Sequence, residues 1–127
     1  LKPDDQIRRV VLCSGKVYFD LVDAREKKGA DDIYLLRVEQ LYPWPMQSLR
    51  KELRRFRNAE IVWCQEEPKN MGAWQFADAW IEETLRRTPL KTKRARYVRP
   101  PASASTPAGI LGRHLKELEK ILGWALA

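Results

Sequence analysis

The 127-residue chain has few of the residues on which most catalytic and metal sites depend. It contains one histidine, His114, and two cysteines, Cys13 and Cys64. No zinc-ligand spacing, Ser-His-Asp order or Gly-rich dinucleotide fingerprint appears, so the sequence offers no complete catalytic constellation. We expect His114 to be a hydrogen-bonded core or rim residue rather than a catalytic base, since it lies on an apolar helical stripe.

Long apolar runs are also missing. No segment approaches the length of a membrane span, and the first residues, Leu1 to Asp5, do not have the form of a signal peptide. We therefore expect a soluble, intracellular protein, cytoplasmic in location. In such a compartment the two cysteines are expected to be reduced and packed rather than bridged.

Acidic residues are absent from one stretch. The chain carries a formal charge of +7, and residues 86–99 hold seven basic side chains and no acidic one. These are Arg86, Arg87, Lys91, Lys93, Arg94, Arg96 and Arg99. Such a run is typical of a solvated surface, and it also suits phosphate, a nucleotide or an acidic protein face. The other basic run, residues 50–57, is interpreted as the solvated face of a helix.

Apolar and amphipathic segments alternate along the chain. The apolar segments predict strands at 9–13, 32–38, 60–64 and 95–98. The amphipathic ones predict helices at about 16–28, 45–56 and 73–85, and a last helix from about 110. Strands of this kind separated by helices predict a three-layer α/β/α sandwich with a mostly parallel sheet of four or five strands. Without a linker or repeat, residues 1–127 are expected to form one domain, in a strand order that stays open.

Particular residues refine the predicted helices. Gly29 is predicted as a left-handed cap that ends the first helix, and Pro45 is predicted in the first turn of the second. The third helix has two apolar edges, one of them containing Phe76 and Trp80, which predicts burial on more than one side.

Two strand ends carry candidate functional residues. Ser14 and Lys16 follow the first strand, where free N–H groups at a helix start and one ammonium would attract phosphate or carboxylate. The alternative is that Ser14 caps an ordinary helix. Residues 65–74, after the third strand, contain the interdomain or partner-contact candidates Gln65, Glu66, Glu67, Asn70 and Trp74. Their alternative is a polar loop with solvated glutamates, in which Asn70 or Gly72 caps the next helix.

Four segments, in order, resemble one known family. They are residues 9–21, 37–45, 63–74 and 102–105, the last followed by Gly109 and His114. The family is the C-terminal domain of the E1 component of 2-oxoglutarate dehydrogenase, a thiamine-diphosphate-dependent enzyme. Departures are small: Phe19 stands where Tyr is common, and Arg99-Pro100-Pro101 replaces a Gly-Arg-Pro type turn.

The resemblance implies a transketolase C-terminal-like fold within a homodimeric enzyme of the citric acid cycle. That enzyme decarboxylates 2-oxoglutarate oxidatively and transfers succinyl to the lipoyl group of its E2 partner. Thiamine diphosphate and magnesium would be held by two preceding domains and not by this one, so the isolated chain is not expected to be catalytic. Whether it is an enzyme by itself is therefore left open by the sequence.

The resemblance also implies roles for the candidate residues. The 65–74 residues would contact the preceding domains or the second subunit, and Ser14, Lys16, Arg94 and Arg96 would bind an acetyl-CoA or AMP effector. The alternative function is a basic module that binds anions or nucleic acid, although no nucleic-acid motif supports it. A small enzyme with a cysteine nucleophile is a further alternative, and it lacks a partner base.

Overall fold

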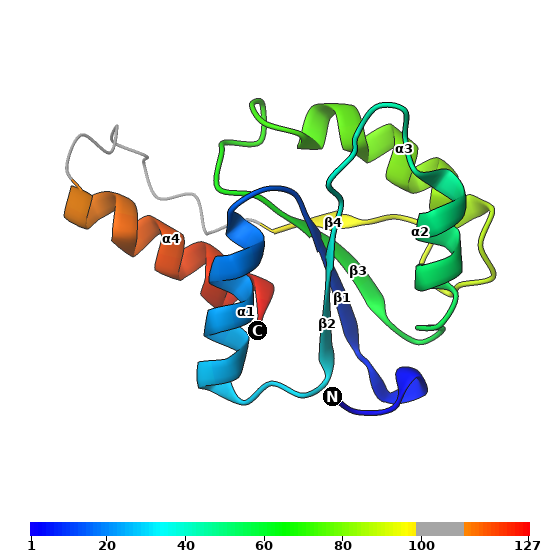
Figure 1. Ribbon diagram of the computed structural model, residues 1–127, viewed down its shortest axis with the longest axis horizontal. Helices are drawn as coiled ribbons and strands as arrows, with labels where there is room; N and C mark the ends of the chain where they lie inside the picture. The colour runs from blue at the N-terminus through cyan, green and yellow to red at the C-terminus, as the bar shows by residue number, and fades with distance from the viewer. Residues whose placement is uncertain (99–110) are drawn as a thin grey trace.

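The computed structural model describes residues 1–98 and 111–127, and side chains within 1–98 and 117–127 (Figure 1). Its sheet has the strands β1 (Arg9–Cys13), β2 (Ile33–Arg37), β3 (Glu60–Cys64) and β4 (Arg96–Tyr97). They lie in the order β2-β1-β3-β4, and every pair is parallel. The predicted α/β class with a mostly parallel sheet is confirmed.

Helices cover both faces of the sheet (Figure 1). The helices α1 (Val17–Lys28) and α4 (Leu111–Ala125) lie on one face. On the other face lie α2 (Met46–Leu53) and α3 (Trp74–Arg86), and a short 3-10 turn, η1 (Asp4–Gln6), precedes β1. No helix among the described residues is long and apolar enough to span a membrane.

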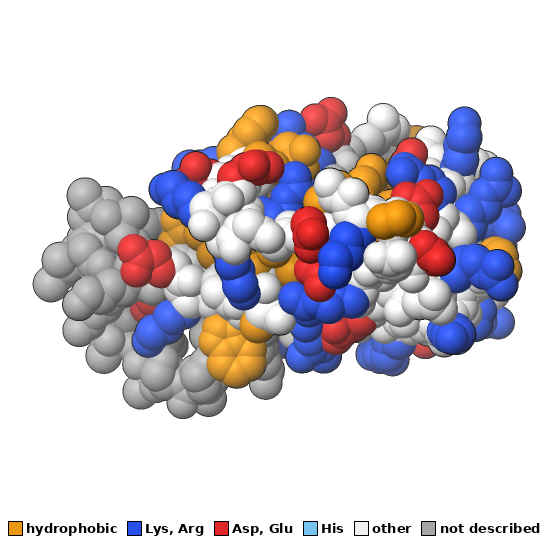
Figure 2. Space-filling view, turned by 90° about the horizontal axis from the view of Figure 1, so that it is seen from below, with side chains coloured by type: hydrophobic (Ala, Val, Ile, Leu, Met, Phe, Trp, Pro, Cys, Tyr) orange, Lys and Arg blue, Asp and Glu red, His pale blue; other side chains and the backbone are white. Residues whose placement is uncertain are grey.

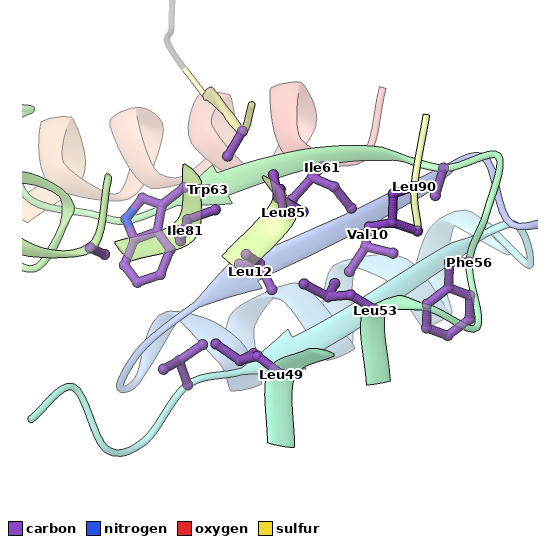
Figure 3. Packing of buried hydrophobic residues seen from close by; sticks show 14 of the residues in the cluster. Val10, Leu12, Leu49, Leu53, Phe56, Ile61, Trp63, Ile81, Leu85 and Leu90 are labelled. Carbon is purple, nitrogen blue, oxygen red and sulfur yellow. The ribbon is translucent and has the colours of Figure 1, made fainter. Parts of the chain in front are cut away.

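The alternation of side chains along the strands divides the buried residues into two cores. Val10 and Leu12 of β1 face α2 and α3, together with Ile61 and Trp63 of β3 (Figure 3). Their neighbours Val11, Cys13, Val62 and Cys64 face α1 and the end of α4. Because both faces are covered, β1 is buried at all five positions, which explains the apolar run of its residues 10–13.

The predicted strands at 9–13 and 60–64 are confirmed, and other boundaries differ by a few residues. α2 ends at Leu53 rather than Phe56, because the chain leaves the helix in a turn in which Phe56 N–H donates to Leu53 O. Pro45 precedes α2 rather than lying in its first turn. β4 has two residues instead of four, and they pair with Val62 and Trp63 of β3. The 102–105 motif, Gly109 and the His114 side chain lie outside the described residues.

Gly29 ends α1 as predicted. Its φ of 69° lies in the left-handed region, and its N–H donates to the carbonyls of Arg25 and Glu26. Glycine adopts this conformation without the steric cost of a Cβ atom, which explains why the helix ends there.

Arg9, at the start of β1, joins the sheet to the C-terminal helix. The residue is 8% exposed, and its guanidinium donates to the carbonyls of Trp124 and Ala125 at 3.2 and 3.0 Å and pairs with Glu60. The last carbonyls of a helix have no partner within the helix. Arg9 therefore caps α4, while Lys28 donates to Leu126 O at 2.7 Å from α1.

Cys13 and Cys64 are direct partners in the parallel pair of β1 and β3. Both are free and buried, as expected from the sequence. Burial raises the pKa of each thiol from 9.0 to about 12, so both are protonated at neutral pH. A protonated, buried thiol is a poor nucleophile, which disfavours the cysteine-enzyme alternative.

Candidate functional site

The two candidate segments meet at the topological switch point of the sheet. The connection after β1 leads to α1 on one face, whereas the connection after β3 leads to α3 on the other (Figure 1). Adjacent parallel strands whose connections diverge leave a crevice at their carboxyl ends, where α/β proteins place ligand and partner contacts. Residues 14–16 and 65–73 follow these two strands directly and lie at their carboxyl ends.

Gln65 organises the loop that follows β3. Its side-chain oxygen accepts from Trp63 Nε1–H at 2.9 Å and from the Trp74 backbone N–H at 3.0 Å. Its Nε2 lies 2.8–3.0 Å from the carbonyl oxygens of Glu67, Pro68 and Met71. An amide has two N–H groups, so three acceptors at these distances use its full donor capacity. One buried amide thus fixes both ends of the loop and its middle.

Gly72 lets the loop close on itself. Its φ is 68°, and a Cβ atom built at this position would lie 3.1–3.2 Å from the Glu67 side chain. Neither Asn70 nor Gly72 caps α3, contrary to the alternative considered for them. The residue that precedes α3 is Ala73, and the first N–H of the helix is satisfied by Gln65.

Glu66, Glu67 and Asn70 lie at or near the surface of this loop. Glu67 and Asn70 are exposed, Glu66 is half-buried, and Trp74 is buried against Tyr97 with a ring separation of 5.2 Å. Beside them is an open pocket of about 620 Å³, lined by Lys69, Asn70, Trp74, Gln75 and Asp78. Of the five predicted loop residues, Asn70 and Trp74 line this pocket, whereas Gln65 is buried.

Lys16 connects the loop after β1 to the loop after β3. Its ammonium lies 2.8 Å from Asp20 and 3.9 Å from Glu66, and the side chain is 73% exposed. The hydrogen bond to Asp20 raises the pKa of Lys16 above its usual value. Ser14 does not cap α1, because the helix follows Lys16 and has no side-chain cap bond. That alternative for Ser14 is wrong.

Arg94 and Arg96 lie elsewhere, each near acidic residues. Arg94 is 3.9 Å from Asp78 and 3.6 Å from Glu82, both on α3. Arg96 pairs with Glu60 at 2.6 Å, at the amino end of β3 and opposite the edge that carries Lys16. The four residues predicted to bind an effector do not form one cluster, although each remains accessible to solvent.

Sequence reasoning missed an exposed aromatic surface made of Tyr42, Phe76 and Trp80. These side chains are 84%, 40% and 42% exposed. The rings of Tyr42 and Phe76 are 6.5 Å apart, and Trp80 stacks at 6.5 Å on Trp44, which is buried. The expectation that both apolar edges of α3 are buried is wrong within this chain. The edge with Ala77, Ile81 and Leu85 is buried, and the edge with Phe76 and Trp80 is open.

Comparison with known proteins gives a match along the chain. A family model described as 2-oxoglutarate dehydrogenase C-terminal matches residues 1–126. The chain is 58% identical over 126 residues to proteins named 2-oxoglutarate dehydrogenase E1 component from Brucella anthropi, Brucella ovis and Brucella suis. The alignment covers 99% of this chain and 12–13% of those proteins. The chain thus spans about one eighth of their length.

Proposed function

The chain belongs to the 2-oxoglutarate dehydrogenase C-terminal family, and from this membership we propose that it acts as a non-catalytic domain of an E1 component. The whole enzyme would decarboxylate 2-oxoglutarate oxidatively in the cytoplasm. It would pass the succinyl group to the lipoyl group of its E2 partner. The 58% identity along nearly the whole chain supports this assignment.

Thiamine diphosphate and magnesium would be held by other domains of that enzyme. Within residues 1–98 and the described side chains of α4, no group of three or more His, Cys, Asp or Glu side chains is placed to hold a metal ion. The contribution that we propose for this domain is structural contact.

We propose that the contact surface consists of the 65–73 loop and the aromatic surface of Tyr42, Phe76 and Trp80. The open aromatic surface carries this proposal, because contiguous exposed aromatic side chains mark protein contacts. The loop adds exposed polar groups, Glu67 and Asn70, on a backbone that Gln65 holds in one conformation. Such a preformed surface loses little conformational entropy on docking. Its partners would be the preceding E1 domains and the second E1 subunit.

Effector binding at Ser14, Lys16, Arg94 and Arg96 stays a prediction. The exposure of Lys16 is in its favour, whereas the separation of Lys16 from Arg96 is not. The alternative of a nucleic-acid module is weaker. Arg86, Arg87, Arg94 and Arg96 lie beside carboxylates, which reduces the charge available to phosphates.

The test uses the full-length dehydrogenase that contains this chain. One variant carries Glu67→Ala and Asn70→Ala, a second carries Phe76→Ser and Trp80→Ser, and Trp124→Ser is a control on the opposite helix layer. Subunit assembly is measured by sedimentation, and turnover by carbon dioxide release from 2-oxoglutarate with an artificial electron acceptor.

We expect the aromatic variant to weaken assembly roughly tenfold or more, since aromatic contacts dominate the energy of interfaces. Trp124→Ser should behave as wild type. Wild-type assembly and turnover in both the Glu67→Ala/Asn70→Ala variant and the Phe76→Ser/Trp80→Ser variant would show that this surface makes no contact needed for function. Carbon dioxide release by the isolated chain would contradict its non-catalytic role.

A further inference from the structure

Three basic side chains at the C-terminal end of α2 and directly after it line one cleft. Arg50, Lys51 and Arg54 border a volume of about 330 Å³, which Gln47, Thr88 and Pro89 complete. Among the described side chains, no ion pair joins any of the three to a carboxylate. This sets them apart from the arginines at the end of α3 and after it, because Arg86, Arg87, Arg94 and Arg96 all lie near acids.

Glu52 on α2 and Glu83 on α3 are already paired with other groups. Glu52 accepts from Arg55 at 2.8 Å and from the Tyr34 hydroxyl at 3.4 Å. Glu83 accepts from Arg86 and Arg87 at 3.1 and 2.8 Å. The positive charge of the cleft is therefore not neutralised by its neighbours. Basic side chains gather toward the end of the molecule where α2 lies (Figure 2).

The geometry holds these like charges together. Arg54 follows α2 with helical backbone angles and lies four residues after Arg50, a spacing that places side chains on one side of a helix, where like charges repel. The Nε–H of Arg50 is buried and lacks a hydrogen-bond partner. Lys93 adds another positive charge beside the cleft, because its ammonium donates to the Thr88 carbonyl at 3.0 Å. The negative end of the α2 dipole attracts cations to the C-terminal end of the helix. The dipole does not itself provide an acceptor for the N–H groups of these side chains.

We propose that this cleft binds a small multivalent anion of the phosphate class. The planar guanidinium groups of Arg50 and Arg54 match the oxygens of a phosphate, to which arginine donates two parallel hydrogen bonds. Lys51 supplies a point charge at the rim. The cleft is large enough for one or two phosphoryl groups. The site is separate from the 65–73 loop and does not depend on the proposed interdomain role.

The experiment uses the 127-residue chain and inorganic diphosphate at constant ionic strength set with sodium chloride. Binding is measured by calorimetry and by chemical-shift changes of backbone amides. We expect saturable binding, with the largest shifts at residues 47–54 and 88–90. Arg50→Gln with Arg54→Gln should weaken binding at least about tenfold. The single change Lys51→Gln should weaken binding less. Lys51 is exposed, so this variant tests the site without replacing the half-buried Arg50.

A matched control removes two charges elsewhere. Lys2→Gln with Lys27→Gln lowers the net charge by the same amount at positions far along the chain from α2, and should leave the affinity within about twofold. Equal weakening by this control would show diffuse attraction and overturn the proposal. So would the absence of saturable binding, shifts centred on residues 14–16, or binding of a hexaglutamate peptide without binding of diphosphate. Without binding, the remaining role of Arg50, Lys51 and Arg54 would be a favourable interaction with the negative end of the helix dipole.

Discussion

Replacement of Gln65 by leucine tests whether one amide holds the contact loop. The change leaves two buried donors, Trp63 Nε1–H and the Trp74 N–H, without an acceptor. An orphaned buried donor costs about 1–3 kcal/mol, so the two together predict a loss of about 2–6 kcal/mol. The carbonyls of Glu67, Pro68 and Met71 lie in exposed residues and regain water, so we count no cost for them.

Leucine is close to glutamine in volume and adds apolar contact, which offsets part of the loss. We therefore expect Gln65→Leu to lower the free energy of unfolding by about 3 kcal/mol. For a chain of this length that corresponds to a fall in Tm of roughly 10 °C. A domain of ordinary stability, about 5–15 kcal/mol, stays folded at 25 °C, so the variant can be purified and compared.

The assay is urea unfolding followed by tryptophan fluorescence, with hydrogen exchange of residues 65–74 measured under native conditions. Gln75→Leu, an exposed glutamine ten residues away on α3, is the matched control and should change stability by less than about 0.5 kcal/mol. Equal stabilities of the Gln65 and Gln75 variants, with unchanged exchange in the loop, would refute the reasoning.

Two further predictions concern the sheet. Arg9→Met should destabilise the domain by about 1–3 kcal/mol, because the carbonyls of Trp124 and Ala125 lose their donor. The neighbouring Arg8→Met removes an exposed pair with Asp32 and should cost less than about 1 kcal/mol, so equal urea midpoints for the two variants would contradict the cap. Cys13 and Cys64 should not react with Ellman's reagent at pH 8 until the chain unfolds. Their folded pKa of about 12 exceeds the unfolded value of 9.0, so the native state binds more protons between these values and stability falls as the pH rises through them. A Cys13→Ala and Cys64→Ala variant should lose that part of the alkaline dependence, and a dependence identical to wild type would rule the thiols out as its source.

Continuous apolar runs made parts of the fold predictable. β1 and β3 were predicted at their observed boundaries, since interior strands of a parallel sheet are apolar on both faces. β4 is an edge strand with one neighbour, and the apolar pattern cannot indicate where its pairing stops. The parallel direction follows from the helical crossovers, whereas the strand order depends on packing between distant segments.

The candidate site was predictable in place and less so in mechanism. Polar residues after β3 indicated a loop at the carboxyl ends of the strands. The role of Gln65 depends on Trp63, two residues earlier on the same side of the strand, and on the fold of the loop back toward Trp74. The exposure of Phe76 and Trp80 was predicted wrongly, because the cover that an apolar edge requires can come from outside the chain. The acids beside Arg94 and Arg96 come from α3 and β3, which precede the acid-free segment or overlap its start, so a count within that segment misses them.

The bond between Arg9 and the carbonyl of Ala125 joins residues 116 positions apart. During synthesis, β1 leaves the ribosome long before the acceptor of its arginine is made. Contacts of such long range form late, since the loop between them must first close. The α1-side layer is therefore completed only after the last turn of α4 has been translated. In a nascent chain halted before that turn, α1 alone would cover this face of β1.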